Sequence, residues 1–128
     1  MNWKRILIFV LINYLATAGA AFPFGFIEGF LTARQTPVPT WVPLSQELAV
    51  LVAAAIVFYL FSRRQRSRLW LHAFMVAVIG WLVSFPVNVL ALGQSVATWG
   101  YSLLFLLASL IAGVSLASSL RRGAKEGE

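Results

Sequence analysis

The sequence contains no cysteine, one histidine and four acidic residues. The absence of thiols excludes disulfide exchange, thiolate catalysis, iron–sulfur ligation and cysteine-based zinc sites. The single histidine, His72, has no second ligand-type residue near it in the sequence, so we interpret it as an interfacial residue. No nucleophile–base pair, metal-ligand set or phosphate-binding loop is present. We therefore expect a protein that is not an enzyme and that has no cofactor and no metal site.

Charge is also scarce, at 11% of residues, whereas apolar residues make up 60%. Soluble domains have roughly 25% and 45–50% of these classes. A soluble fold of 128 residues would expose apolar patches larger than the few hundred Å² that soluble monomers tolerate. A bilayer accepts the same surface without cost. The composition predicts a single-domain, all-α integral membrane protein.

The basic residues form short clusters that flank apolar stretches. The clusters are Lys4 and Arg5, then Arg63, Arg64, Arg66 and Arg68, then Arg121, Arg122 and Lys125. Such clusters fix membrane topology and contact anionic lipid head groups. Nucleic-acid binding needs a continuous basic face instead, so we expect the lipid bilayer to be a partner and nucleic acid not to be one.

Uncharged stretches define four predicted transmembrane helices, at about 6–27, 43–62, 69–92 and 98–120. The first has 22 uncharged residues, or about 33 Å of helix, enough for a hydrocarbon core of about 30 Å. The 52 uncharged residues of 69–120 suit two helices with a turn near 93–95. The second helix is short unless it begins near Pro43, which would place Glu47 one turn inside.

The distribution of positive charge predicts the orientation. With four spans, nine of the ten basic residues fall on one side and only Arg34 falls on the other. Positive-inside bias then places both termini in the cytoplasm of an inner-membrane protein. We expect two antiparallel hairpins, a proline-rich outer loop at 36–43 and a short, disordered cytoplasmic tail at 121–128.

Two alternatives to this plan stay open. Residues 1–20 resemble a signal peptide with a small-residue cleavage site, and its removal would leave three helices. Pro23 and Pro86 each lie 18 residues after an arginine, Arg5 and Arg68. This spacing suggests a parallel repeat of one hairpin, although shared membrane constraints explain it as well.

Polar residues inside the spans are the candidate contacts for a partner or a solute. Asn13 and Thr17 lie within the first helix. A buried amide needs partners, which a serine of the fourth helix or a second protein could supply. Pro23 and Pro86 remove backbone hydrogen bonds, and kinks there would shape the packing or open a vestibule. Ser84 and Asn88 flank Pro86 and could bond the freed carbonyls.

Small-residue stripes predict which helix faces pack closely. The third helix carries Ala73, Ala77, Gly80, Ser84 and Asn88 on one face. The fourth helix carries two stripes, Ala108, Ala112, Ser115 and Ser119, and beside them Ser109, Gly113 and Ala117.

Glu28 and Glu47 are the only acids before the C-terminal tail. Ionisable groups near membrane depth are often functional, and two close carboxylates could carry a proton. The structural alternative pairs Glu28 with Arg34 and makes Glu47 a first-turn acid beside an N-cap at Ser45.

Two functional hypotheses remain. The first is a non-enzymatic membrane protein that binds a membrane partner, either another protein or a second copy. It would act as an accessory subunit of a complex or as a protective protein of the immunity type. The second is a small dimeric transporter or channel for protons, cations or small solutes that uses Glu28 and Glu47.

Overall fold

The computed structural model describes residues 3–65 and 68–126, and within these residues the chain is helical throughout apart from its connections. The elements are α1 (Trp3–Ala33), α2 (Trp41–Arg64), α3 (Leu69–Phe85), the π-helical segment η1 (Pro86–Ala91) that continues α3, and α4 (Val96–Glu126). Four helices, with α3 and η1 taken together, are long and apolar enough to cross a membrane. The predicted all-helical architecture with four such helices is confirmed, and it is that of a multi-pass membrane protein.

Most of the apolar surface faces outward. Only 17–28% of the most apolar window of each helix is buried inside the structure. Large side chains such as Leu15, Phe22 and Leu92 are more than 60% exposed. Exposure of this extent would cost roughly 25 cal/mol per Å² in water, whereas lipid removes the cost.

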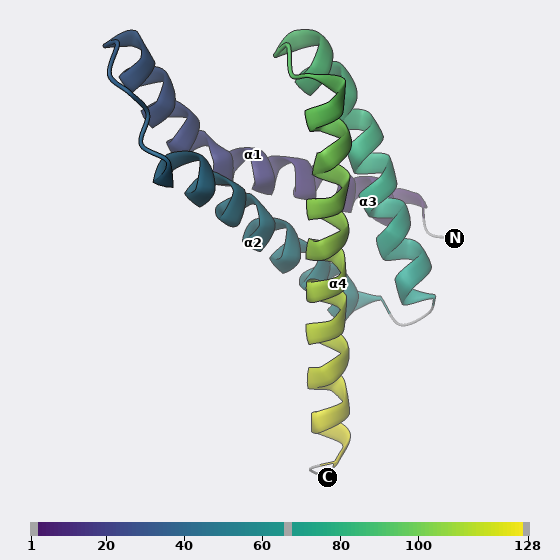
Figure 1. Ribbon diagram of the computed structural model, residues 1–128. Helices are drawn as coiled ribbons and strands as arrows, with labels where there is room; N and C mark the ends of the chain where they lie inside the picture. The colour runs from purple at the N-terminus through teal and green to yellow at the C-terminus, as the bar shows by residue number, and fades with distance from the viewer. Residues whose placement is uncertain (1–2, 66–67, 127–128) are drawn as a thin grey trace.

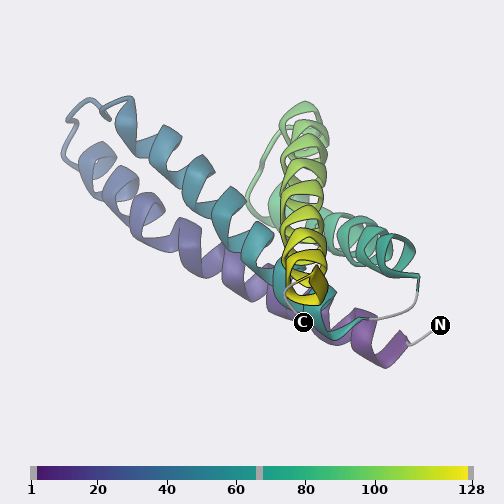
Figure 2. The same ribbon diagram turned by 90° about the horizontal axis from the view of Figure 1, so that it is seen from below.

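The helices form two pairs that cross each other (Figures 1 and 2). In one pair α1 and α2 lie side by side and run in opposite directions, and α3 and α4 form the other pair. The core lies where the pairs cross, near the start of α1, the end of α2, the start of α3 and the middle of α4. Its buried members are Ile6, Phe9, Val10, Val57, Phe58, Phe61, Ala73, Val76, Ala77, Leu110 and Val114. Beyond this core the pairs diverge, so the 34–40 and 92–95 connections form two separate tips (Figure 1).

Two helices extend beyond their predicted ends. α1 passes Glu28 and continues to Ala33, and α4 continues to Glu126, so most of the tail predicted to be disordered is helical. A charged side chain does not interrupt backbone hydrogen bonding, which is why charge was a poor marker of helix ends. The predicted anchor Arg66 lies outside the described residues, and the side chain of Arg122 is likewise not described.

α2 begins earlier than predicted, at Trp41, with Thr40 at its N-cap position. Pro43 therefore lies in the first turn, where a proline is tolerated. Glu47 lies well beyond that turn, and the first turn of α2 has no acidic residue. The prediction of Ser45 as the N-cap with Glu47 as a first-turn acid is wrong.

The two prolines in helices have different local effects. α1 continues as one α-helix through Pro23, whereas the helix changes to π-type hydrogen bonding at Pro86. The amide of Leu92 donates to the carbonyl of Val87 at 2.9 Å, as the wider π turn requires. Gly93 then adopts a φ of +68°, which favours glycine and turns the chain toward α4.

Candidate functional site

Asn13 is the polar side chain buried deepest in α1. It is 6% exposed, and its Oδ1 has no hydrogen-bond partner among the described residues. The predicted hydrogen bond to a serine of α4 is therefore not formed through this oxygen. A buried acceptor without a donor costs free energy, so Asn13 is a destabilising feature of the packed core.

Thr17 does not contribute to that amide. Its hydroxyl donates to backbone carbonyls one turn earlier, to Asn13 O at 2.9 Å and Tyr14 O at 3.1 Å. Threonine in a membrane helix commonly satisfies its hydroxyl in this way. Its role is thus local to α1.

The two membrane-level acids are both exposed and lie apart along the helix axis. The rings of Phe9 and Phe61 are 4.9 Å apart, and Arg5 Nη1 donates to Gln65 Oε1 at 3.2 Å. The two contacts agree on one antiparallel register, in which Phe9 of α1 lies opposite Phe61 of α2 and Arg5 lies opposite Gln65. In this register Glu47 is level with Pro23, five residues from Glu28, or about 7.5 Å along the axis.

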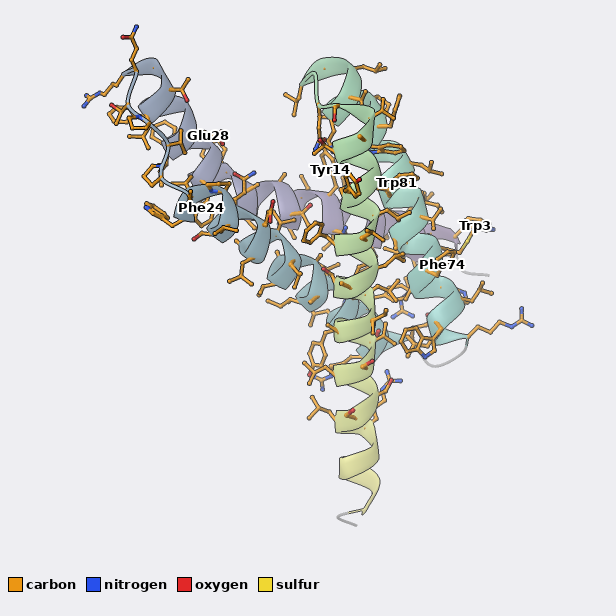
Figure 3. All side chains as sticks on the ribbon, viewed as in Figure 1. Trp3, Tyr14, Phe24, Glu28, Phe74 and Trp81 are labelled. Atoms are coloured by element: carbon orange, nitrogen blue, oxygen red, sulfur yellow. The ribbon has the colours of Figure 1, made fainter. Side chains whose placement is uncertain are left out.

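Neither acid has the structural role predicted from the sequence. Glu28 lies on the arm of α1 that diverges from α3 and α4 (Figure 3). The guanidinium of Arg34, the expected partner of Glu28, lies over the ring of Phe30 at 4.1 Å. Both carboxylates are exposed on the α1–α2 pair.

The small face of α3 packs against α1. Ala73 and Ala77 are fully buried, and a Cβ placed on Gly80 would contact Val10 Cγ1 at 3.9 Å, an ordinary distance. The prediction that these residues mediate helix packing is confirmed for this part of the stripe. Gly80 is half-buried and lies beside Val10 of α1.

Ser84 is part of an aromatic contact between α3 and α4 that the sequence analysis missed. The rings of Trp81 and Trp99 stack at 3.7 Å between centroids, and Phe85 meets Trp99 edge-on at 4.9 Å. Trp99 Nε1 donates to Ser84 Oγ, and Trp81 Nε1 donates to the carbonyl of Trp99, both at 3.1 Å. We call Trp81, Ser84, Phe85 and Trp99 the aromatic clasp; Trp81 is labelled in Figure 3. Because Trp81 and Trp99 are 18 positions apart, no local sequence pattern predicts that their rings stack.

Pro86 and Asn88 lie just beyond the clasp, in η1. Pro86 is exposed and Asn88 is half-buried. The carbonyl of Asn88 accepts a hydrogen bond from the amide of Gln94 at 2.9 Å, so the connection after η1 satisfies this backbone group.

α4 packs on α2 through one of its two small-residue stripes. Ser109 Oγ donates to the carbonyl of Leu51 at 3.1 Å. A Cβ on Gly113 would lie 2.9 Å from both Phe58 Cβ and Tyr59 N, closer than real Cβ atoms pack. With Ala117, which is 1% exposed, these residues form the α2–α4 seam, where the two helices cross at an angle with the same chain direction (Figure 1).

The second stripe of α4 faces outward. Its four members, Ala108, Ala112, Ser115 and Ser119, are all exposed. The hydroxyl of Ser119 donates to the carbonyl of Ser115 at 3.0 Å. We call these four residues the outer small face.

Gln65 joins three helices where the basic clusters meet. Its side chain accepts from Arg5 of α1 and is 6% exposed. Arg121 of α4 donates to the carbonyls of Ser62 and Gln65 at the end of α2. A helix C-terminus leaves carbonyls without intrahelical partners and favours a cation. Arg121 therefore caps α2, a role beyond the topology anchor predicted for it.

His72 is the remaining residue that the sequence singles out. Nδ1 of His72 lies 2.9 Å from the carbonyl oxygen of Arg68, and the side chain is buried in the first turn of α3. Within residues 3–65 and 68–126, no three histidine or acidic side chains come together as metal ligands. No protein-family model matches the chain, and no curated protein or solved structure is significantly similar to it.

Proposed function

We propose that this protein is a non-enzymatic, multi-pass inner-membrane protein that acts by binding a membrane partner through the outer small face of α4. In this proposal the two termini and the 65–68 connection are cytoplasmic, and the 34–40 and 92–95 connections are outside. The excess of arginine and lysine at one end supports this orientation, because cytoplasmic loops retain positive charge.

The observation that carries the proposal is the exposure of the outer small face. Small residues on a membrane helix allow a second helix to approach closely, and van der Waals packing then drives the association. Ala108, Ala112, Ser115 and Ser119 are spaced four, three and four residues apart, the repeat of a helix–helix seam. The adjacent stripe through Gly113 already packs on α2, so α4 offers two comparable surfaces, only one of which is used within the chain.

Three of the other candidate residues support this interpretation because they make contacts within the fold. Ser84 bonds Trp99, Thr17 bonds its own helix, and Gly80 packs on α1. A complex in which this chain is an accessory subunit, or a toxin that it blocks as an immunity-type protein, requires only a surface and no reactive group.

Site-specific crosslinking tests the proposal. The chain has no cysteine, so Ala112→Cys and Ser115→Cys can each carry a photoreactive maleimide in native membranes. Ala18→Cys on the exposed face of α1 is the matched control. We expect one adduct of defined mass from positions 112 and 115 and none from position 18, and Ala108→Leu should abolish it. Lipid adducts alone at all three positions would refute the proposal.

The transporter hypothesis predicts a different experimental result. A proton- or cation-coupled path through Glu28 and Glu47 requires that Glu28→Gln or Glu47→Gln abolish flux in reconstituted vesicles. Both carboxylates are exposed on the α1–α2 pair and lie at different levels. We expect both variants to retain the crosslinked adduct; a flux lost in either variant would favour the transporter instead.

A further inference from the structure

A pocket lies between α2 and α4 at the basic end of the molecule. Its volume is about 240 Å³, and its lining residues are Tyr59, Arg63, Ala117, Leu120 and Arg121. This volume is below the roughly 300–1,000 Å³ of pockets that enclose a small molecule, so it suits a head group whose remainder lies outside.

The α2–α4 seam sets how these side chains face one another. Ser109 contacts Leu51, and Arg121 contacts Ser62, so the two contacts have nearly the same sequence offset between α2 and α4. Tyr59 is therefore level with Ala117, and Arg63 is level with Arg121, one turn further toward the basic end. The pocket lining thus has two arginines at one level of the helix backbones, and Tyr59 and Ala117 one turn before them.

The two arginines are held in place by different contacts. Arg121 is positioned by the carbonyls of Ser62 and Gln65, and the guanidinium of Arg63 lies 5.8 Å from the centre of the Tyr59 ring. A guanidinium has five N–H donors, so these contacts leave donors for a ligand. Planar guanidinium groups match the geometry of a phosphate, which can accept hydrogen bonds from both.

The charge balance of this end favours an anion. In the sequence, nine of the ten basic residues fall in 4–5, 63–68 and 121–125, ranges that contain no acid, and Glu126 and Glu128 follow them. Two guanidinium groups on one pocket repel each other unless an anion lies between them. Leu120, at the pocket's edge, is 55% exposed, so an apolar side chain of the lining faces the surroundings of the chain.

We propose that this pocket binds an anionic phospholipid, with its phosphate between Arg63 and Arg121 and one acyl chain leaving past the exposed side chain of Leu120. Basic pockets between membrane helices on the cytoplasmic side recognise lipid head groups in this manner. The site is distinct from the outer small face and does not depend on a protein partner.

Native mass spectrometry of the full chain in detergent tests the site, with phosphatidylglycerol as the probe and zwitterionic phosphatidylcholine as the comparison. We expect selective binding of phosphatidylglycerol, weakened about tenfold by Arg63→Gln, because a charge-assisted hydrogen bond is lost. Arg64→Gln removes the same charge from the neighbouring position outside the pocket and is expected to change the affinity less than twofold. Tyr59→Phe, which keeps the ring, is expected to retain binding.

Three outcomes would overturn the proposal. Equal losses in Arg63→Gln and Arg64→Gln would indicate diffuse electrostatic attraction without a pocket. Equal binding of the two lipids would contradict recognition of an anion. Displacement of phosphatidylglycerol by millimolar inorganic phosphate would identify a site for free phosphate in place of a lipid. Because Arg121 also caps α2, its substitution is not needed for the test.

Discussion

At the scale of single residues, Gly113 is the described glycine at which an added side chain would meet the closest contacts. The backbone of α2 passes so close that a Cβ would meet both Phe58 and Tyr59. Lipid supplies no hydrophobic force that would hold two helices together, so close approach provides the packing energy. The α2–α4 seam depends on this glycine more than on any large side chain.

We predict that Gly113→Ala destabilises the protein by about 1–3 kcal/mol, the usual cost of overpacking. Chemical unfolding in detergent, followed by tryptophan fluorescence, measures the change. Gly29→Ala is the control, because nothing lies within 4 Å of a Cβ at that position. Equal stability of Gly113→Ala and Gly29→Ala would contradict the close packing of α2 on α4 at Gly113.

Asn13 leads to the opposite prediction, because its Oδ1 is buried without a donor. Asn13→Leu replaces the amide with an apolar group of similar shape and removes an acceptor that costs about 1–3 kcal/mol when it is unsatisfied. We expect unchanged or increased stability in the same unfolding experiment. A loss above 1 kcal/mol would mean that the amide has a partner in the membrane.

At the scale of elements, the aromatic clasp joins α3 to α4 beyond the shared core. Two of its hydrogen bonds involve one hydroxyl, since Ser84 accepts from Trp99 and donates to the carbonyl of Trp81 at 2.7 Å. This contact holds the start of α4 against the end of α3 just before the π segment.

Removing that hydroxyl tests the clasp. We expect Ser84→Ala to cost about 1 kcal/mol, because the indole N–H of Trp99 loses its acceptor. Ser119→Ala removes the same atom from an exposed serine that bonds only its own helix and should be nearly neutral. A double-mutant cycle with Trp99→Phe should give a positive coupling energy, and independent effects would contradict the clasp.

The elements themselves were largely predictable from the sequence. Long uncharged stretches predicted four helices, and glycine predicted the turn at Gly93. Helix ends were predicted less well because α1 continues past Glu28 and α4 past Arg121. A charge marks where a helix leaves lipid, whereas hydrogen bonding and capping decide where it ends.

Most tertiary contacts at the candidate sites could not be predicted from the sequence. The spacing of Ser109, Gly113 and Ala117 did predict a close-packing face, but nothing local indicated whether this stripe or the adjacent one would meet α2. The Trp81–Trp99 stack and the capping of α2 by Arg121 depend on the register between separate helices. Such registers follow from the summed packing of all four helices.

At the scale of the whole molecule, two crossing helix pairs share one core at the basic end and diverge toward the opposite tips (Figure 1). The account requires that this basic end be cytoplasmic and that both tips be outside. The lipid pocket and the exposed small face then lie on the membrane-facing surface of one polytopic chain.

Cysteine accessibility in intact cells tests this arrangement most directly, because the chain has no cysteine of its own. Thr36→Cys and Ser95→Cys report on the two tips, and Lys4→Cys and Arg64→Cys report on the basic end. A membrane-impermeant maleimide should label positions 36 and 95 in intact cells, and positions 4 and 64 only after permeabilisation. Labelling of position 4 or 64 from outside, or of only one tip, would contradict four spans with cytoplasmic termini.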